Sequence, residues 1–256
     1  MIDPATAFRL DGKVALVTGG TRGIGRAIAE AYANAGAGVC VLARKPDELE
    51  ETRAALAAVG PGVAVYAGSA GDPEAIDACV AHCLAELGGV DILVNNAGTN
   101  PTFGPMIETE SRAVRKVLEV NLEGPLALAQ AAWRAWMREH GGTIINVASL
   151  GGIRPSMFIG MYNTSKAALL HMTRQLAVEL APDVRVNALA PGLVKTHFAR
   201  ALYEQDEEGV AAQFPMKRLG VPDDCAGAAL FLASEASSWL TGEVIVVDGG
   251  ALVGGP

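Results

Sequence analysis

Short apolar runs alternate with longer amphipathic stretches along almost the whole chain. The apolar runs predict β-strands at Lys13–Thr18, Val39–Ala43, Val63–Ala67, Asp91–Asn95, Thr143–Ser149, Val184–Leu189 and Val244–Val247. The stretches between them have helical periodicity and predict helices at Gly23–Gly36, Asp47–Val59, Pro73–Leu87, Glu110–Arg138 (interrupted near Gly124 and Pro125), Tyr162–Leu180 and Asp223–Ala233. Strands that alternate with helices in this way indicate an α/β fold, in which a parallel sheet carries helices on both faces.

One connection in this pattern is much longer than the others. It runs from Pro191 to the helix that starts at Asp223, and it contains the acidic patch Glu204–Glu208. Long connections in compact domains often form lids or binding loops, although an ordinary surface excursion fits the pattern equally well. No repeat, low-complexity tract or linker divides the chain. We therefore expect a single domain over residues 1–256, with a candidate substrate loop at about 193–216.

The composition favours a globular protein with a large core. Half of the 256 residues are apolar, only 19% are charged, and the formal net charge is -8. An acidic surface disfavours nucleic acid and anionic membranes as partners. No apolar run approaches the roughly 20 residues that a membrane-spanning helix needs, so we expect no membrane insertion.

The cysteines and the chain ends favour a cytoplasmic location. The four cysteines form no CxxC pair, which is typical of reduced thiols. Cys79, His82 and Cys83 crowd one predicted helix and offer metal ligands, but a fourth ligand is missing nearby and the two cysteines fit the apolar face of that helix. We expect no metal site. Residues 1–10 do not resemble a signal peptide, and residues 253–256 match no recognised address signal.

The turn between the first strand and the first helix is rich in glycine. Residues 18–25 read Thr-Gly-Gly-Thr-Arg-Gly-Ile-Gly. Such a turn alone is weak evidence, but its position after a strand and before a helix is the one in which backbone N–H groups and the helix dipole bind a pyrophosphate. The candidate dinucleotide-binding residues here are Gly19, Thr21, Arg22, Gly23, Ile24 and Gly25.

The end of the second predicted strand indicates which dinucleotide binds. NAD-specific folds carry a carboxylate there for the ribose 2′-hydroxyl. This chain reads Arg44-Lys45, with no acidic residue until Asp47. Arg44 and Arg22 are therefore candidate ligands of a 2′-phosphate, although both also fit the description of solvated surface residues. The pattern favours NADP(H) as the cofactor.

Further motifs resemble the classical short-chain dehydrogenase/reductase family, and the resemblance extends from Lys13 to Gly250. The matching motifs are Thr18–Gly25, Asp91, Asn95–Gly98, Asn121, Ser149, Tyr162, Lys166, Pro191-Gly192 with Thr196, and Asp248–Gly250. The resemblance implies a doubly wound (Rossmann) seven-stranded parallel sheet, one domain that is both dinucleotide-binding and catalytic, and a homotetramer. It also implies that Asp91 orders backbone near the adenine and that Thr18 ties the glycine-rich turn to Asn95–Gly98.

Tyr162 and Lys166 are four residues apart and share a helix face, with Ser149 thirteen residues upstream of Tyr162. A nearby ammonium and the positive nicotinamide of NADP⁺ favour the phenolate of a tyrosine, whose ordinary pKa is about 10. By resemblance, Tyr162 exchanges a proton with a carbonyl oxygen, Ser149 hydrogen-bonds that oxygen, Lys166 also binds the nicotinamide ribose, and Asn121 anchors a water. The further cofactor-binding residues that the resemblance implies are Ser69 (in place of the family's aspartate near the adenine), Asn95, Ala97, Gly98, Pro191, Gly192, Val194 and Thr196.

Within the family, the stretches Asn96–Pro101, Ala190–Thr196 and Arg218–Gly227 resemble the NADPH-dependent carbonyl reductases, and the 3-oxoacyl-carrier-protein reductases are close relatives that share most of these motifs. The first implies a small carbonyl or alcohol substrate. For it we expect an uncharged, apolar compound, because the candidate lining offers few cationic groups for a carboxylate; this lining is Phe103, Leu150, Ile153, Met157, Phe158, His197 and Phe198. The second requires a basic docking surface, for which the candidates are Arg112, Arg115, Lys116, Arg134 and Arg138. A catalytically silent nucleotide-binding regulator is a third reading, which the intact set of catalytic residues disfavours.

Two predicted helices, Glu110–Arg138 and Tyr162–Leu180, are expected to hold the homotetramer together. We expect their apolar residues to exceed what one sheet face can cover, and large exposed apolar faces normally mark interfaces. The residues concerned are Leu126, Leu128, Trp133, Trp136, Leu169, Leu170, Met172 and Leu176.

Overall fold

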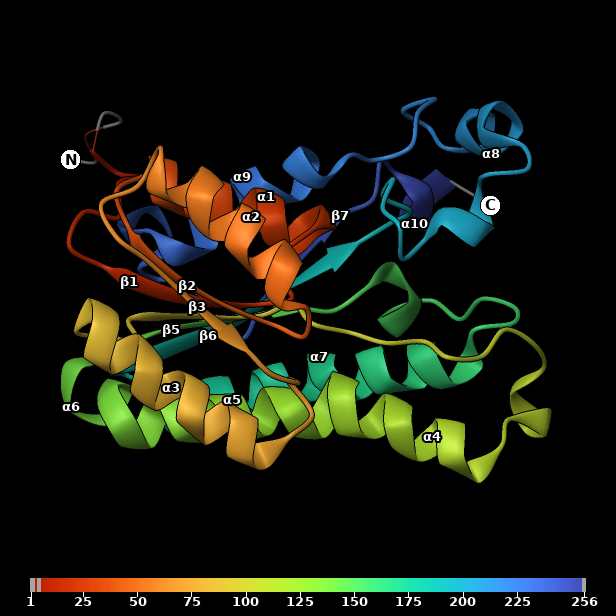
Figure 1. Cartoon of the computed structure of the whole chain (residues 1–256). Coiled ribbons are helices and arrows are strands. Elements are labelled where there is room, and N and C mark those ends of the chain that lie inside the picture. Colours follow the sequence, from red (N-terminus) through yellow and green to blue (C-terminus); the bar gives the residue numbers. More distant parts are fainter. Residues whose placement is uncertain (1–2, 4–5, 255–256) are drawn as a thin grey trace.

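A twisted sheet of seven parallel strands forms the centre of the computed structural model, which describes residues 3 and 6–254 (Figure 1). The strands are β1 (Val14–Thr18), β2 (Gly38–Ala43), β3 (Val63–Ala67), β4 (Ile92–Asn95), β5 (Gly142–Val147), β6 (Val184–Pro191) and β7 (Val244–Val247). Their order in the sheet is β3-β2-β1-β4-β5-β6-β7. The predicted doubly wound seven-stranded sheet is confirmed, and each strand lies within two residues of its predicted bounds.

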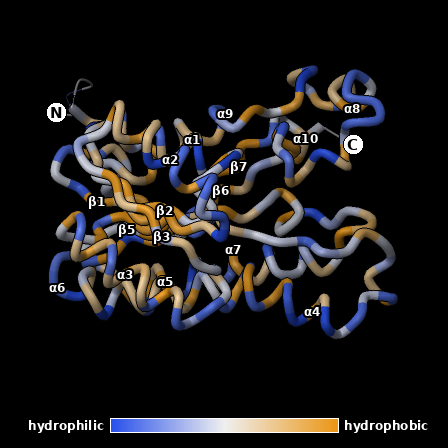
Figure 2. Tube along the Cα trace, in the orientation of Figure 1, coloured by the Kyte–Doolittle hydropathy of each residue, from blue (hydrophilic) through white to orange (hydrophobic). Residues whose placement is uncertain are grey.

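Helices cover both faces of the sheet (Figure 1). One layer contains α1 (Gly23–Asn34), α2 (Pro46–Ala57) and α9 (Pro222–Ala233). The other layer contains α3 (Pro73–Leu87), α5 (Gly124–Ala132) and α7 (Gly160–Leu180). Because both faces are covered, the strands are almost wholly apolar, and Figure 2 shows them as a hydrophobic band between the more polar outer surfaces of the helices.

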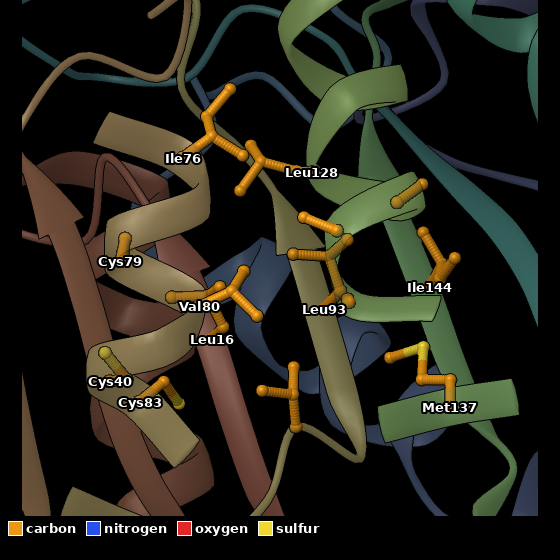
Figure 3. Packing of buried hydrophobic residues seen from close by; sticks show 14 of the residues in the cluster. Leu16, Cys40, Ile76, Cys79, Val80, Cys83, Leu93, Leu128, Met137 and Ile144 are labelled. Atoms are coloured by element: carbon orange, nitrogen blue, oxygen red, sulfur yellow. The ribbon is translucent and has the colours of Figure 1, made fainter. Parts of the chain in front are cut away.

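The core on the α3 and α5 side shows how the strand residues pack (Figure 3). Leu16 and Leu93 of the sheet lie under Val80 of α3 and Leu128 of α5, and all four are buried. The labelled residues Cys40, Cys79 and Cys83 belong to the same cluster. The expectation that Cys79 and Cys83 lie on an apolar helix face is therefore confirmed. Among residues 3 and 6–254, no three His, Cys, Asp or Glu side chains gather closely enough to hold a metal ion.

The long helical stretch after β4 differs from its prediction. It consists of α4 (Ser111–Leu118), α5 and α6 (Arg138–His140), joined by π-helical turns at Glu119–Glu123 and Trp133–Met137. The helix therefore continues through Gly124 and Pro125, where an interruption was expected. Pro125 lies beside the π-helical turn Glu119–Glu123, where the regular α-helical hydrogen-bond pattern is already interrupted, and a side chain at Gly124 would collide with the carbonyl oxygen of Ala70.

The apolar residues used to predict the tetramer are covered only in part within one chain. Leu128, Leu169 and Leu170 are fully buried, and the other five are partly buried. Trp133, Trp136 and Leu176 pack against the α3 and α5 side of the core, and Met172 packs against a smaller cluster. The premise that these helices carry more apolar surface than the sheet can cover therefore holds only for the five partly exposed residues, and one chain alone does not test it. The homotetramer stays a prediction.

The long connection after β6 is partly helical and returns to the C-terminal segment. It contains a 3₁₀ turn at Arg200–Leu202 and α8 (Glu207–Gln213). After α8, Phe214 and Leu219 of the same connection form a small core with Ala251 of α10 (Ala251–Gly254). Residues 1–2, 4–5 and 255–256, which contribute to the expectations about the chain ends, lie outside the described residues. Within the described ones, no helix combines the length and hydropathy needed to cross a bilayer.

Candidate active site

A cleft of about 680 Å³ opens at the carboxyl ends of the strands. This is the edge at which open parallel sheets bind ligands, and the volume is typical of a ligand site. The predicted site residues that line it are Gly19, Thr21, Arg22, Gly23, Ile24, Arg44, Ser69, Ala97, Gly98, Ser149, Tyr162, Lys166, Pro191, Gly192, Val194 and Thr196. Gly25, Asn95 and Asn121 are not among the lining residues.

The glycine-rich turn has the backbone conformation that a phosphate-binding turn needs. Gly19 and Gly23 have positive φ values of 65° and 57°, which L-residues with side chains rarely adopt. A Cβ atom at Gly23 would lie 3.1 Å from Cγ2 of Thr196, so the loop after β6 closes against this turn. Helix α1 begins at Gly23 and has no acidic residue in its first turn. Its N-terminus can therefore face an anion, as a dinucleotide pyrophosphate requires.

Gly25 and Asn95 lie behind the lining of the cleft. A side chain at Gly25 would collide with the amide of Asn96, which donates hydrogen bonds to the carbonyl oxygens of Thr18 (2.8 Å) and Gly19 (3.2 Å). The Asn95 amide lies on the face of the sheet that α5 covers, where it donates to Oδ1 of Asn146 at 2.9 Å and to the carbonyl oxygen of Pro125 at 3.3 Å. Both residues thus shape the cleft without facing it.

Thr18 behaves as the resemblance implies, whereas Asp91 does not. The Thr18 hydroxyl accepts hydrogen bonds from the backbone N–H groups of Asn96 and Ala97, both at 3.0 Å, which ties the first turn to the end of β4. Asp91 directly precedes β4, so it lies at the amino ends of the strands, whereas the cleft lies at their carboxyl ends. It accepts hydrogen bonds there from the N–H of Val14 (2.8 Å) and Nε1 of Trp136 (3.2 Å). The expectation that Asp91 orders backbone near the adenine was wrong.

Ser149, Tyr162 and Lys166 meet at the inner end of the cleft. Ser149 follows β5, and Tyr162 and Lys166 project from the first two turns of α7. The Lys166 ammonium is buried, donates a 2.7 Å hydrogen bond to the carbonyl oxygen of Val147, and lies 5.7 Å from the centroid of the Tyr162 ring. The spacing in the sequence therefore does bring a hydroxyl, a phenol and an ammonium together in one cleft.

Burial dominates the electrostatics of this group. It raises the pKa of Tyr162 to about 12, and a hydrogen bond with Ser149 acts in the opposite direction. Burial also lowers the pKa of Lys166 to about 8. At neutral pH Tyr162 is therefore a protonated phenol. Burial thus opposes the phenolate, and its stabilisation by Lys166 together with the positive nicotinamide of NADP⁺ stays a prediction.

Asn121 lies behind the cleft, in the π-helical turn Glu119–Glu123, and is fully buried. Its amide nitrogen donates hydrogen bonds to the carbonyl oxygen of Thr99 and to the hydroxyl of Ser165, both at 3.0 Å. Its side-chain oxygen accepts one from the N–H of Thr99 at 2.8 Å. Asn121 thus connects the loop after β4 to the helix that carries Tyr162 and Lys166.

The opposite end of the cleft, near the end of β2, contains a residue that the sequence reasoning missed. Arg22, Arg44 and Lys45 line it, and so does Glu48 in the first turn of α2. Oε1 of Glu48 accepts a 2.7 Å hydrogen bond from Nζ of Lys45, and Oε2 accepts one of 3.0 Å from the hydroxyl of Thr21. The hydrogen bond from Lys45 holds the pKa of Glu48 below its usual value.

The predicted substrate residues divide into two groups. Phe103, Leu150, His197 and Phe198 line the cleft, and the Phe198 ring lies 5.7 Å from the Tyr162 ring. The other three, Ile153, Met157 and Phe158, are exposed and do not line it.

The substrate part of the lining also holds a cation that the sequence reasoning did not include. Arg154 lines the cleft, and its guanidinium donates a 3.4 Å hydrogen bond to the carbonyl oxygen of Ala251. The expectation of a lining poor in cationic groups therefore needs correction. Five positions separate Arg154 from Ser149, but nothing in the sequence shows that its side chain turns back into the cleft.

Comparison with known proteins shows that this chain is similar to short-chain dehydrogenases/reductases. A family model described as "Enoyl-(Acyl carrier protein) reductase" matches residues 19–251. The chain is 43% identical to dehydrogenase/reductase SDR family member 4 of Bos taurus over 249 residues, which cover 95% of this chain and 88% of that protein. The protein of the same name in Homo sapiens is 42% identical over 247 residues, covering 94% and 88%.

Solved structures agree in fold over nearly the whole chain. A short-chain type dehydrogenase/reductase from Mycobacterium marinum has a TM-score of 0.92 at 38% identity, covering 97% of this chain and 99% of that one. The L-sorbose reductase of Gluconobacter frateurii, solved in complex with NADPH and L-sorbose, has a TM-score of 0.90 at 34% identity, covering 96% and 99%.

Proposed function

The chain belongs to the classical short-chain dehydrogenase/reductase family, whose members interconvert carbonyls and alcohols with NAD(P)H, and we propose that it is an NADP(H)-dependent carbonyl reductase. One observation carries the proposal: Ser149, Tyr162 and Lys166 line a single cleft with the glycine-rich turn that suits a dinucleotide. An acid, a hydrogen-bond donor and a cation thus stand within reach of one bound carbonyl group.

The three side chains have distinct roles in this proposal. Bound NADPH supplies the hydride for the carbonyl carbon. Tyr162 donates its proton to the carbonyl oxygen, and the pKa of about 12 keeps the phenol protonated for this purpose. Ser149 donates a hydrogen bond to the same oxygen as negative charge develops on it. Lys166 holds positive charge beside the phenol, and Asn121 anchors a water that returns the proton.

The cofactor contacts follow from where the lining residues lie. Gly19, Thr21, Gly23 and Ile24 surround the turn and the N-terminus of α1, which suit the pyrophosphate. The cations near the end of β2 suit a 2′-phosphate. The remaining lining residues are assigned to the adenine (Ser69) and to the ribose and nicotinamide (Ala97, Gly98, Lys166, Pro191, Gly192, Val194 and Thr196). The NADPH in the similar L-sorbose reductase supports this choice of cofactor.

The proposed substrate is an uncharged ketone or aldehyde with an apolar body. Phe103, Leu150 and Phe198 supply an apolar lining beside Tyr162, and residues 193–216 are proposed as the substrate loop over it. Arg154 is the cation in this part of the lining that could bind a substrate carboxylate. Its guanidinium donates a hydrogen bond to the carbonyl oxygen of Ala251. We propose a compound without a carboxylate because the apolar side chains Phe103, Leu150 and Phe198 line the cleft beside Tyr162.

Reduction of a 3-oxoacyl thioester on a carrier protein is the second candidate. The name of the matching family model supports a carrier-bound substrate, and Arg112 and Arg115 on α4 are exposed. The other basic candidates are engaged. Lys116 pairs with Glu119, Arg134 lies 3.6 Å from Asp77, and Arg138 lies over the Trp133 ring.

A substrate screen tests the proposal directly. Purified protein with NADPH is offered aromatic and aliphatic ketones, aldehydes, and 3-oxoacyl thioesters of pantetheine and of carrier protein, and NADPH absorbance is followed. We expect turnover of at least one ketone or aldehyde without carrier protein. Turnover of carrier-bound thioesters alone would favour the second candidate. Dinucleotide binding without turnover of any compound would favour the silent regulator.

A further inference from the structure

Glu48 places a carboxylate among the cations at the 2′ end of the proposed cofactor site. Its two oxygens accept hydrogen bonds from Lys45 and Thr21, and Oε1 lies 3.9 Å from Nη1 of Arg22. All four side chains line the cleft. Glu48 is also the more buried partner, since 30% of its side chain is exposed compared with 62% for Lys45 and 52% for Arg22.

The carboxylate divides the three cations of this end into two kinds. Lys45 and Arg22 each form an ion pair with Glu48. Arg44 has no ion pair among residues 3 and 6–254, and it is exposed at the end of β2. An incoming 2′-phosphate therefore meets one unengaged cation, two shared cations and one negative charge.

We propose that Glu48 is a specificity-determining residue of the dinucleotide site, which weakens the preference for NADPH over NADH. The inference rests on the proposed function, because it requires NADP(H) to bind in this cleft. A phosphate monoester carries a charge between about -1 and -2 at neutral pH, so a carboxylate in the same group of cations repels it and competes with it for Lys45 and Arg22. The ribose 2′-hydroxyl of NADH carries no charge, so Glu48 leaves NADH binding nearly unchanged.

A purely structural role for Glu48 predicts the opposite sign. If its main effect is to orient Lys45 and Arg22 toward the phosphate, removing its charge releases both side chains and weakens NADPH binding. The substitution Glu48→Gln separates the two cases, because glutamine keeps the shape and an oxygen that can accept from Lys45 or Thr21. Glu50→Gln is a matched control. Glu50 lies in the same helix and pairs with Arg53, and neither residue lines the cleft.

The experiment measures dissociation constants of NADPH and NADH by nicotinamide fluorescence for the wild type and both variants. We expect Glu48→Gln to lower the dissociation constant of NADPH roughly tenfold at low salt, and by less at high salt, because partly exposed charges are screened. The constant for NADH should change less than about twofold, in line with the modest worth of exposed charges. Glu50→Gln should change neither.

A double-mutant cycle adds a second test. In a Lys45→Gln background, Glu48→Gln should have a smaller effect on NADPH binding, because one of the shared cations is gone. Unchanged or weaker NADPH binding by Glu48→Gln, or an equal change for both dinucleotides, would overturn the inference while leaving the proposed function intact. Failure of the wild type to bind either dinucleotide would overturn both together.

Discussion

Lys166 donates a 2.7 Å hydrogen bond to the main-chain carbonyl oxygen of Val147, the last residue of β5. This bond connects the helix that carries Tyr162 to the strand that leads into Ser149. The ammonium is consequently held by a central strand of the sheet and not by a surface loop. A group fixed in this way stays in place beside the phenol without a cost for ordering it during the reaction.

Replacing Tyr162 by phenylalanine should abolish turnover and leave dinucleotide binding nearly intact. The phenyl ring keeps the shape of the side chain and its contact with Phe198, but it has no proton to donate. Loss of a positioned general acid costs about a hundredfold or more in rate. Steady-state assays together with NADPH titration check this. A variant that keeps more than about a tenth of the wild-type rate, far above that loss, would show that another group is the principal acid.

Replacing Lys166 by methionine should stabilise the protein and inactivate it. Burial lowers the pKa of Lys166 from 10.5 to about 8, so at pH 7 the folded chain carries a buried cation that the unfolded chain exposes to water. Methionine removes that penalty and loses only the hydrogen bond to Val147. We expect the free energy of unfolding to rise by roughly 1–3 kcal/mol at pH 7, measured by urea denaturation.

The pH dependence of this difference has a definite sign. Between pH 8 and 10.5 the unfolded wild type binds more protons at this lysine than the folded one, so the wild type gains stability as the pH rises. The advantage of Lys166→Met should therefore be constant below about pH 8 and shrink above it. A difference that grows with pH across this window would contradict the assignment of a buried ammonium.

Gly25→Ala should destabilise the glycine-rich turn. The new methyl group would lie 2.5 Å from the carbonyl oxygen of Gly19 and would collide with the Asn96 amide, which its own hydrogen bonds hold in place. Overpacking of this kind costs about 1–3 kcal/mol of unfolding free energy. Gly227→Ala is the control, because a methyl group at this position of α9 would meet open space within 4 Å, and alanine there should stabilise by about 0.5–1 kcal/mol. Equal effects of the two substitutions would refute this role of Gly25.

Most of the fold could be predicted because helix and strand boundaries depend on residues that are close together in the sequence. Helix α3 has the predicted bounds Pro73–Leu87, since an aspartate cap and a proline mark its start and Gly88 in a left-handed conformation marks its end. The π-helical turns at Glu119–Glu123 and Trp133–Met137 have no such marker. They arise from how the helix must fit around its neighbours, as Asn121 shows by reaching both Thr99 and Ser165.

Site residues could be predicted where a sequence motif specifies both the residue type and its position at the end of a strand or the start of a helix. They could not be predicted where the direction of a side chain depends on how a neighbouring segment packs. Ser149, Tyr162 and Lys166 follow from spacing at a strand end and a helix start. Glu48 was missed because the carboxylate was sought at the strand end itself, whereas the first turn of α2 brings it back over Thr21. Arg154 was missed for a similar reason, since its direction depends on the packing of the segment after Ser149.

Neutral substrates should be preferred over their acids. Ethyl benzoylformate and benzoylformate present the same aryl ketone with and without a negative charge. We expect the ester to have at least a roughly tenfold higher kcat/KM, because the described lining offers mainly apolar groups beside Tyr162 and desolvating a carboxylate there is unfavourable. Preference for the free acid would contradict this. Loss of that preference in Arg154→Gln would then identify the guanidinium as the group that binds the carboxylate.

The last prediction concerns Arg44 and the choice of cofactor. Arg44 stands at the end of β2, lines the cleft, and has no ion pair within the described part of the chain, so it is the cation best placed to bind a 2′-phosphate without losing another partner. A charge-assisted hydrogen bond contributes about 1.5–3 kcal/mol, but this edge is open to solvent, which screens it. We therefore expect the wild type to prefer NADPH by roughly tenfold to a hundredfold.

Arg44→Ala should raise the Michaelis constant for NADPH and barely alter that for NADH. Ala43→Asp should go further, because a carboxylate at the last position of β2 repels the phosphate and can accept hydrogen bonds from the ribose hydroxyls. Steady-state kinetics with both dinucleotides and one carbonyl substrate measure the two effects. Equal efficiency of the wild type with NADPH and NADH, or an Arg44→Ala effect of the same size for both, would reduce Arg44 to a solvated surface charge, because only a contact with the 2′-phosphate distinguishes the two cofactors.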